Sequence, residues 1–176
     1  RTFEAKKYSS VCVSNFQPIY RSVCRLSGKG AQRIGIVGGL PRLSSTKERI
    51  SAYQEAVEDC GLPQEESLVL YGDSMENSVQ SCLDDLLAQK CDAIVDCQGL
   101  MASETIIYLH QKGLQLARDI DLVSFVDYDS NFYELYSSQM DCIVQPVEEL
   151  GRAAGEQILS RIENPDAPIF EKVLTS

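Results

Sequence analysis

The sequence has little of what several common classes of protein require. It holds one histidine, His110, and its seven cysteines form no Cys-x-x-Cys pair, so the clustered ligands of a zinc site are missing. No apolar run approaches the roughly 18 residues of a membrane-spanning helix. The G-x-G-x-x-G, G-x-x-x-x-G-K-[ST] and G-x-S-x-G motifs are absent as well. These absences argue against a zinc protein, a membrane protein, a nucleotide-binding enzyme and a serine hydrolase.

Basic residues are also outnumbered. Sixteen lysines and arginines stand against 26 aspartates and glutamates, which gives a net charge of −10. Because nucleic-acid binding depends on neutralising phosphates, this chain alone is not expected to bind DNA. The acidic runs fall on polar faces of expected helices, where carboxylates are solvated. His110 has no sequence cue that pairs it with a nucleophile, so we predict no catalytic residue, no metal site and no cofactor.

The cysteines favour a reducing compartment. They occupy positions 12, 24, 60, 82, 91, 97 and 142. Their number is odd and most fall inside apolar strand or helix patterns, so we interpret them as small buried side chains rather than a disulfide framework. This favours a cytoplasmic location. The first residues, RTFEAKKYSS, form neither a signal peptide nor a Met-initiated terminus, so we interpret the chain as a fragment.

What the sequence does contain is a regular alternation of short apolar runs with helical periods. The expected strands are Val11–Ser14, Arg33–Val37, Ser67–Leu70, Ala93–Cys97, Leu122–Val126, Cys142–Val144 and Ile169–Leu174. The expected helices are Pro18–Ser27, Glu48–Cys60, Glu76–Gln89, Ser103–Lys112 and Val147–Ile162. Gly61 and Gly113 follow two of these helices, where a left-handed residue is usual. The alternation predicts an α/β fold, a Rossmann-like parallel sheet with helices on both faces.

The stretch RIGIVGGLPRLSSTKERISAY contains a basic residue in an unexpected place. Ser45 and Glu48 have the spacing of a capping box, which predicts Ser45 as the N-cap and puts Arg49 in the first helical turn. A cation is mildly unfavourable there because the N-terminus of a helix is positive. Arg49 is therefore either a solvated surface residue or a guanidinium directed into a cleft, suited to sugar hydroxyls, carboxylates or phosphates. In both cases its replacement should barely change folding. A similar capping box, Asp73 to Glu76, predicts the start of the third helix.

Several stretches stand in a recognisable order along the chain. They are KGAQRIGIVGG followed by SSTKERISAYQEA, then YGDS, CDAIVDCQGLMA, GLQLARDIDLVSFVD and QPVEELGRAAGEQIL. In this order they resemble the effector domain of the LacI/GalR family of transcription regulators. The family patterns run G-H-x-R-I-x-F-I-x-G, R-x-x-G-F-x-x-A, D-A-I-x-x-x-N-D-x-M-A, D-I-x-V-x-x-F-D-D and Q-P-x-x-x-L-G. The resemblance covers nearly the whole chain.

The resemblance implies a periplasmic-binding-protein-like type I fold. In that fold two Rossmann-like lobes hold a small-molecule effector in the cleft between them, and a helix-turn-helix headpiece precedes them. By this resemblance, the headpiece and the strands that open the first lobe would lie outside this chain. Residues 1–31 would form the end of the first lobe, a closing strand and a helix, and residues 32–141 the second, effector-binding lobe. Residues 142–163 would return to the first lobe, and residues 164–176 would form the final strand of the second lobe.

The resemblance also implies which residues bind the ligand. Arg49 matches the effector-binding arginine of the family, and Ser45, one turn earlier, matches a residue that lines the cleft. Gln145 matches the glutamine of the Q-P pair near the hinge.

Three further expected ligand-binding positions depart from the family pattern. Gln98 stands where the family often has asparagine, and Ser74 stands where many members have an aromatic that stacks on a sugar. Asp127 follows Phe125 and Val126 where the family often has Phe-Asp-Asp. These departures argue against a plain neutral hexose and leave three alternatives open: a phosphorylated sugar, another polar metabolite or no ligand. The run GGLPRLSSTKER resembles the fructose-repressor branch of the family and favours a phosphosugar.

The function implied by the resemblance is that of an effector-sensing and dimerisation domain of a DNA-binding transcription regulator. Its expected partners are a sugar or sugar phosphate, a second copy of the chain and, through the absent headpiece alone, operator DNA; no membrane is expected. One alternative is a free-standing or secreted sugar-binding protein of the same fold. Another is an enzyme on a doubly wound sheet, since a fold does not fix a function.

Overall fold

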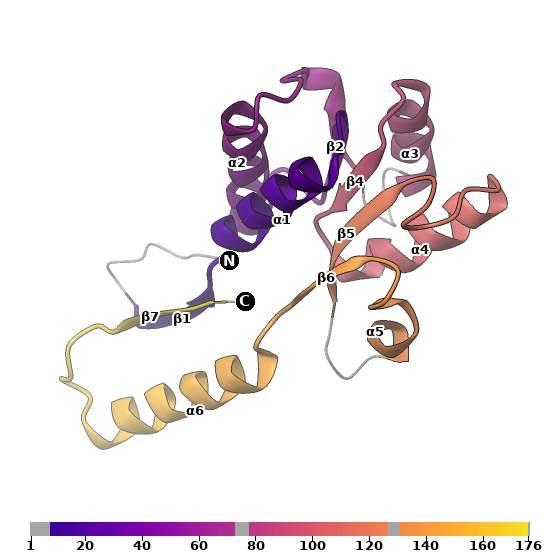
Figure 1. The fold of residues 1–176 in the computed structure, drawn as a ribbon. Helices are drawn as coiled ribbons and strands as arrows, with labels where there is room; N and C mark the ends of the chain where they lie inside the picture. The colour runs from indigo at the N-terminus through magenta and orange to yellow at the C-terminus, as the bar shows by residue number, and fades with distance from the viewer. Residues whose placement is uncertain (1–7, 73–77, 127–130, 176) are drawn as a thin grey trace.

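Five parallel strands form the main sheet of the protein. The computed structural model describes residues 8–72, 78–126 and 131–175. The strand order is β3–β2–β4–β5–β6 (Figure 1). The bounds are Val69–Tyr71 for β3, Ile34–Gly38 for β2, Ala93–Asp96 for β4, Asp121–Val126 for β5 and Asp141–Val144 for β6. Every strand expected from the sequence is present, with ends shifted by at most two residues.

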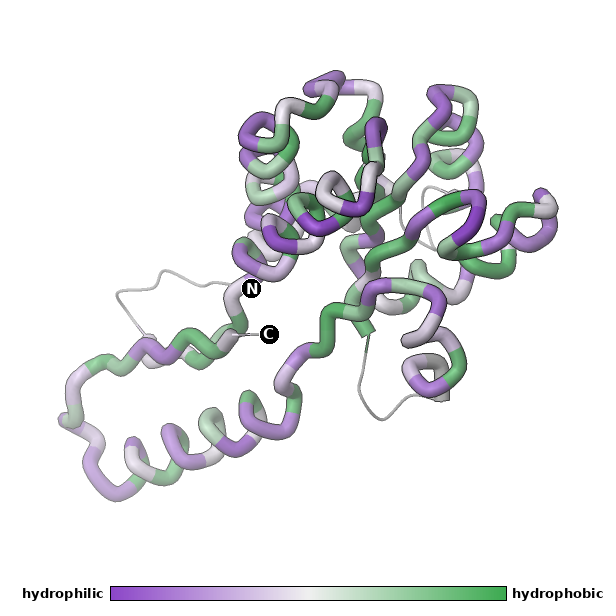
Figure 2. The backbone as a smooth tube through the Cα atoms, in the orientation of Figure 1, coloured by the Kyte–Doolittle hydropathy of each residue, from purple (hydrophilic) through white to green (hydrophobic). Residues whose placement is uncertain are grey.

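Helices cover both faces of this sheet, as predicted. Helices α1 (Phe16–Lys29) and α2 (Ser44–Asp59) lie on one face, and α3 (Val79–Ala88) and α4 (Gly99–Gln111) on the other (Figure 1). Side chains alternate along β4, so that Val95 packs toward α1 and α2 and Ile94 toward α3 and α4. The strands of this sheet are largely hydrophobic along their length, which is typical of a sheet buried on both faces (Figure 2). The Rossmann-like fold class is therefore confirmed.

Several helix bounds differ from the expected ones. Helices α2 and α4 begin four residues earlier than expected, at Ser44 and Gly99. The expected start of the third helix at Glu76, with its capping box from Asp73, lies outside the described residues. Two short helices were not expected, the 3-10 helix η1 (Glu66–Leu68) and α5 (Asn131–Tyr136). Each is too short to show a clear helical period in the sequence.

Glycines end three of the helices in the way the sequence indicates. Gly61 and Gly113, expected at these places, have φ angles of 66° and 78°, and Gly30 after α1 has 110°. A residue with a Cβ is strained at such angles, so glycine fits there. The expected helix ends at Gly61 and Gly113 are confirmed.

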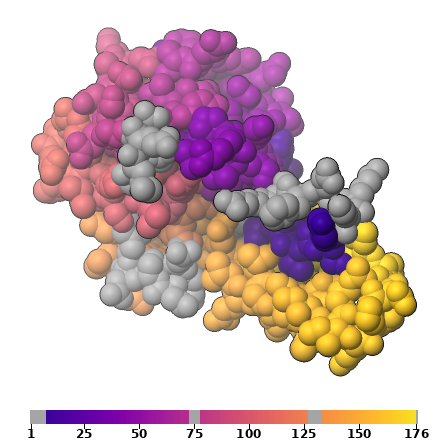
Figure 3. Space-filling view, turned by 180° about the vertical axis from the view of Figure 1, so that it is seen from behind, coloured from indigo at the N-terminus to yellow at the C-terminus, as the bar shows by residue number. Residues whose placement is uncertain are grey.

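A second, smaller body contains β1 (Ser10–Val13), β7 (Glu171–Leu174) and α6 (Val147–Glu163). Strands β1 and β7 pair in parallel as a two-stranded sheet, separate from the main one, and α6 packs along β1. The space-filling view shows α6 and β7 in yellow at one end of the molecule, beside the indigo of β1 (Figure 3). The described chain passes between the two bodies twice, from β1 to α1 and from β6 to α6 (Figure 1).

The observed strand pairing and helix packing differ from the predicted division of the chain in three places. Residues 164–176 were expected to add a strand to the second lobe, but β7 pairs with β1. The helix within residues 1–31 was expected in the first lobe, but α1 packs against α2, because Ile19, Val23 and Leu26 form its buried stripe. Residues 142–144 pair with β5 in the main sheet, so the return to the smaller body starts after them. The other boundaries stay a prediction.

The cysteines are free thiols, and none of the described helices is long and apolar enough to cross a lipid bilayer. Cys82, Cys91 and Cys97 are buried, as expected. The other four are half-buried rather than fully buried. No group of three or more potential metal ligands occurs among the described residues.

Candidate functional site

The start of α2 differs from the capping box expected there. The helix begins at Ser44, after Leu43, and no side chain caps its first turn. Ser45 is thus the second helical residue and half-buried, so its predicted role as the N-cap is wrong. Arg49 is the sixth helical residue, in the second turn, where the effect of the helix dipole has largely decayed. The unfavourable position that the sequence suggested for Arg49 therefore does not arise.

Glu48 binds the start of a different helix. Its Oε1 accepts hydrogen bonds from the backbone N–H groups of Asn15 at 3.0 Å and Phe16 at 3.1 Å. Its Oε2 accepts a third, from the side-chain amide of Asn15, at 3.2 Å. These backbone groups lie at the N-terminus of α1, where N–H groups lack helical partners and negative charge is favourable. Glu48, in the second turn of α2, therefore holds the segment that connects β1 with α1.

Arg49 is buried beside this contact, with 8% of its surface exposed. Its Nε–H donates to Oδ1 of Asn15 at 2.8 Å, and its Nη1 donates to the backbone carbonyl of Cys97. The guanidinium carbon lies 3.5 Å from the centre of the Phe125 ring, within the range of a cation–π contact. One guanidinium is thus contacted by three separate segments: the connection between β1 and α1, the residue after β4, and β5. Arg49 is not a surface residue, so the reason for expecting its replacement to leave folding almost unchanged does not apply.

The electrostatics of Arg49 reflect this burial. Burial lowers the pKa of Arg49, while the nearby Cys97 and Glu48 oppose the shift. An arginine keeps its charge in proteins even when its pKa is lowered, because that pKa starts above about 12. The site therefore holds a permanent positive charge at the carboxyl edge of the sheet.

Gln98 lies at the same edge. It is half-buried, directly precedes α4 and makes no capping hydrogen bond with its side chain. Its amide rests against Gly39, which follows β2, and a Cβ on Gly39 would overlap the Gln98 amide nitrogen. Position 39 therefore favours glycine, because a side chain there would displace Gln98.

The other predicted site residues are less well placed or lie outside the described residues. Gln145 follows β6 at the second crossover, where it is half-buried and its carbonyl accepts the backbone N–H of Val147 at 2.9 Å. Ser74 and Asp127 lie outside the described residues. The ligand-binding role of all six residues stays a prediction.

Sequence reasoning missed the residues that hold Arg49. Asn15 and Glu48 are 33 residues apart and meet only because α1 and α2 lie side by side. Phe125 was part of a recognised stretch, but nothing in the sequence indicated that its ring faces Arg49. The one available signal was the position of Phe125 near the end of a strand in a parallel sheet, because ligands usually contact such positions.

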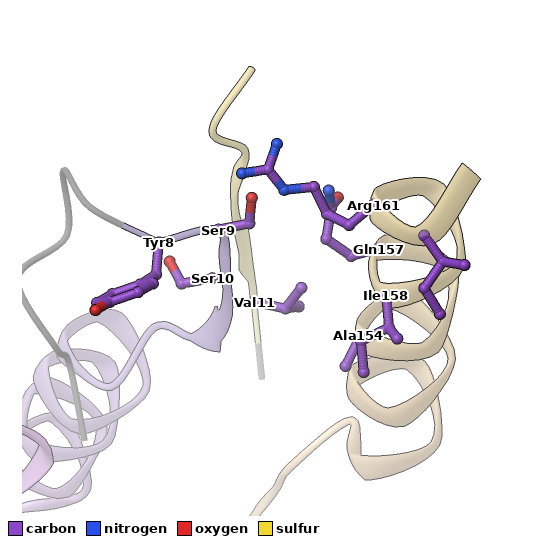
Figure 4. A pocket seen from close by; sticks show the side chains of 9 residues that line it. Tyr8, Ser9, Ser10, Val11, Ala154, Gln157, Ile158 and Arg161 are labelled. Carbon is purple, nitrogen blue, oxygen red and sulfur yellow. The ribbon is translucent and has the colours of Figure 1, made fainter. Parts of the chain in front are cut away.

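A cavity of about 520 Å³ lies elsewhere, between β1 and α6 (Figure 4). Its walls are mostly apolar, and Arg161 at its rim is bound to the carbonyls of Pro165 at 3.1 Å and of Ala167. Ile158 and Ile162 beside it are more than half exposed. An apolar surface of this kind is more typical of packing against other protein than of binding a polar small molecule. None of the predicted site residues lines it.

The fold is that of an α/β domain with polar side chains at the carboxyl edge of its sheet, and its family follows from comparison with known proteins. Residues 23–175 match the periplasmic binding protein-like domain, so the chain belongs to this family. The HTH-type transcriptional regulator CelR of Thermobifida fusca is 28% identical over 159 residues, which cover 89% of this chain and 46% of CelR. The HTH-type transcriptional repressor PurR of Haemophilus influenzae (strain PittEE) is 27% identical over 154 residues, 86% of this chain and 45% of PurR.

A solved structure agrees with these relatives. The transcriptional regulator CelR–cellobiose complex has a TM-score of 0.85 and 27% identity, and the match covers 97% of this chain and 52% of that one. The chain spans about half the length of the relatives it matches. The resemblance to LacI/GalR regulators seen in the sequence is confirmed.

Proposed function

We propose that this chain is the effector-sensing and dimerisation domain of a LacI/GalR-type transcription regulator, and that it binds a sugar or sugar phosphate beside Arg49. The observation that carries the proposal is the buried guanidinium of Arg49, held by Asn15, Cys97 and Phe125 at the carboxyl edge of the sheet. Ligands of open parallel sheets bind at this edge. The domain is a binding module rather than an enzyme, works in the cytoplasm, and reaches operator DNA through a separate headpiece.

Arg49 suits a ligand with hydroxyl or phosphate oxygens. Its Nε and Nη1 are engaged by Asn15 and Cys97, which fixes the plane of the guanidinium. Nη2 carries two further N–H donors in that plane, and each of them can donate to a ligand oxygen. The permanent charge of Arg49 favours a phosphorylated sugar over a neutral one.

A thermal-shift panel tests the proposed ligand class. We expect fructose 1-phosphate or glucose 6-phosphate to raise the melting temperature more than cellobiose or ribose do. At a ligand concentration of about 100 times Kd the added stability is about 2.7 kcal/mol, a shift of roughly 5–10 °C for a domain of this size. Inorganic phosphate serves as the control. If phosphate alone reproduces the whole shift, or if no sugar or sugar phosphate produces one, the proposed ligand class is wrong.

An exposed apolar surface supports the dimerisation part of the proposal. Leu100 and Ile107 on α4 are 81% and 58% exposed, and Leu135 on α5 is 66% exposed. Leu100 and Ile107 are seven residues apart and therefore lie on one side of the helix. A two-fold axis through α4 would place this surface against its own copy, as in most homodimers.

Replacing Ile107 by aspartate should weaken this dimer. A charge in a desolvated apolar contact is unfavourable, so we expect the dimer dissociation constant to rise by about tenfold or more. Analytical ultracentrifugation over a concentration series measures the change. Gln54→Asp on the exposed side of α2 adds the same charge elsewhere and should leave association unchanged. A wild-type chain that is monomeric at every concentration would contradict the dimer.

A further inference from the structure

Two cysteines approach each other away from the proposed effector site. Cys24 lies on α1 and Cys60 directly follows α2, and their Sγ atoms are 3.4 Å apart. Both side chains are half-buried, so small molecules in solution can reach them. They meet because α1 and α2 lie side by side on the same face of the main sheet (Figure 1).

Neighbouring contacts hold this pair of thiols in place. The hydroxyl of Tyr20, one turn before Cys24, donates to Oδ2 of Asp59 at 2.7 Å, and Asp59 directly precedes Cys60. At the other end of the two helices Glu48 binds the backbone of Phe16. Phe16 and Cys24 are eight residues apart, about 12 Å along the helix. Because the helices are joined at both places, the backbone at Cys24 and the backbone at Cys60 cannot separate without breaking these contacts.

We propose that Cys24 and Cys60 form a thiol-oxidation site that closes to an intramolecular disulfide on reaction with a small disulfide such as oxidised glutathione. The sulfur atoms need to approach by only about 1.4 Å to reach the bond length of about 2.05 Å. Side-chain rotation can supply this movement while α1 and α2 keep their positions.

The reaction balances as two exchange steps. The thiolate of one cysteine attacks a sulfur of the small disulfide, the old S–S bond breaks, and a small thiolate leaves and takes up a proton. The thiolate of the second cysteine then attacks the protein sulfur of this mixed disulfide and expels the second small thiolate. The protein loses two thiol protons and two electrons, and the small disulfide is reduced to two thiols.

The surroundings of Cys24 set the pH dependence of this reaction. Burial raises the pKa of Cys24, the neighbouring Cys60 and the charge of Asp59 raise it further, and the hydrogen bond with Tyr20 lowers it. Because the attacking species is the thiolate, the exchange should be slow at pH 7 and faster toward pH 9. A site with these properties responds to sustained oxidation rather than to a brief pulse.

Oxidised glutathione applied to the native protein tests the proposal. We expect the intact protein to lose about 2 Da before alkylation and then to take up two fewer alkyl groups than the reduced protein, and a digest to contain a Cys24–Cys60 linked peptide. The closed loop restricts the unfolded chain, so the melting temperature should rise by roughly 5–10 °C and fall back after reduction.

Variants separate this disulfide from other oxidation products. Cys24→Ser and Cys60→Ser should each abolish both the mass loss and the thermal shift, while the half-buried Cys12→Ser should retain both. The proposal is overturned if the 2 Da loss persists in Cys24→Ser. It is also overturned if both cysteines of the wild-type protein end as separate glutathione adducts. Two serine variants at opposite ends of the bond guard against a result caused by misfolding of one of them.

Discussion

Replacement of Arg49 by alanine should weaken effector binding by about 10- to 100-fold or more. A hydrogen bond from a charged donor contributes about 1.5–3 kcal/mol, and each 1.4 kcal/mol corresponds to a tenfold change in affinity. Arg49→Lys should recover little, because an ammonium cannot bind Asn15, the Cys97 carbonyl and a ligand in one plane. Isothermal titration with the sugar or sugar phosphate that gives the largest thermal shift measures the loss.

The structure adds a stability effect to this prediction. Removal of the guanidinium leaves Oδ1 of Asn15 and the carbonyl of Cys97 without a described donor, at about 1–3 kcal/mol for each buried group. We therefore expect Arg49→Ala to unfold several degrees lower than the wild type, and binding should be compared only where both proteins are folded. Arg42→Ala, which removes an exposed charge seven residues earlier, is the matched control. Wild-type affinity in a folded Arg49→Ala protein would exclude Arg49 from the effector site.

Asp96→Asn should stabilise the protein above neutral pH and should remove most of the dependence of its free energy of unfolding on pH. Asp96 is fully buried at the end of β4, and neither of its carboxylate oxygens has a hydrogen-bond partner among the described residues. The pKa of Asp96 is raised to about 7, chiefly by burial and to a smaller extent by the charge of Glu104, while the neighbouring Thr105 hydroxyl opposes the shift. The charged form is therefore strongly disfavoured in the folded state.

The sign of the effect follows from proton uptake. An unfolded aspartate loses its proton near pH 4, whereas Asp96 in the folded protein keeps it until about pH 7. Between these values the folded state binds more protons, so the free energy of unfolding falls as the pH rises. The total loss above pH 7 is about 4 kcal/mol, since each pKa unit corresponds to about 1.4 kcal/mol.

Urea unfolding at pH 5 and pH 8 measures this loss. The wild type should unfold at a clearly lower urea concentration at pH 8, and Asp96→Asn should show a much smaller difference between the two pH values. The exposed Asp85→Asn, on α3, should behave like the wild type. A wild-type protein that is equally stable at both pH values would show that Asp96 does not titrate in this range.

The sequence was informative about elements and less so about contacts between them. The strands were recognised because each is a short apolar run, and the ends at Gly61 and Gly113 because glycine adopts a positive φ angle with the least strain. The cap at Ser45 was wrong because the S-x-x-E spacing is a local signal. Glu48 uses its carboxylate on Asn15 and Phe16 instead, more than 30 residues away, and no local pattern contains that contact.

At the candidate site, too, a residue could be predicted from the sequence but its contacts could not. The choice of Arg49 came from the family resemblance, but its burial under contacts from Asn15, Cys97 and Phe125 depends on how three segments meet in space. Cys97 contributes a backbone carbonyl, which every residue type has, so its identity carried no signal. The pairing of β7 with β1 was missed for a related reason, because the two strands lie at opposite ends of the sequence and no local pattern indicates that they meet.

The contact between Glu48 and the start of α1 has a mechanical consequence. Two bodies joined at two points can turn only about the line through those points, which leaves one rotational degree of freedom. Glu48 fastens Asn15 and Phe16 to the larger body, so the first pivot falls at Ser14. At the second crossover the ring of Pro146 fixes its own φ, so the other pivot falls at Gln145. We therefore expect any rotation of one body against the other to be torsion about an axis from Ser14 to Gln145.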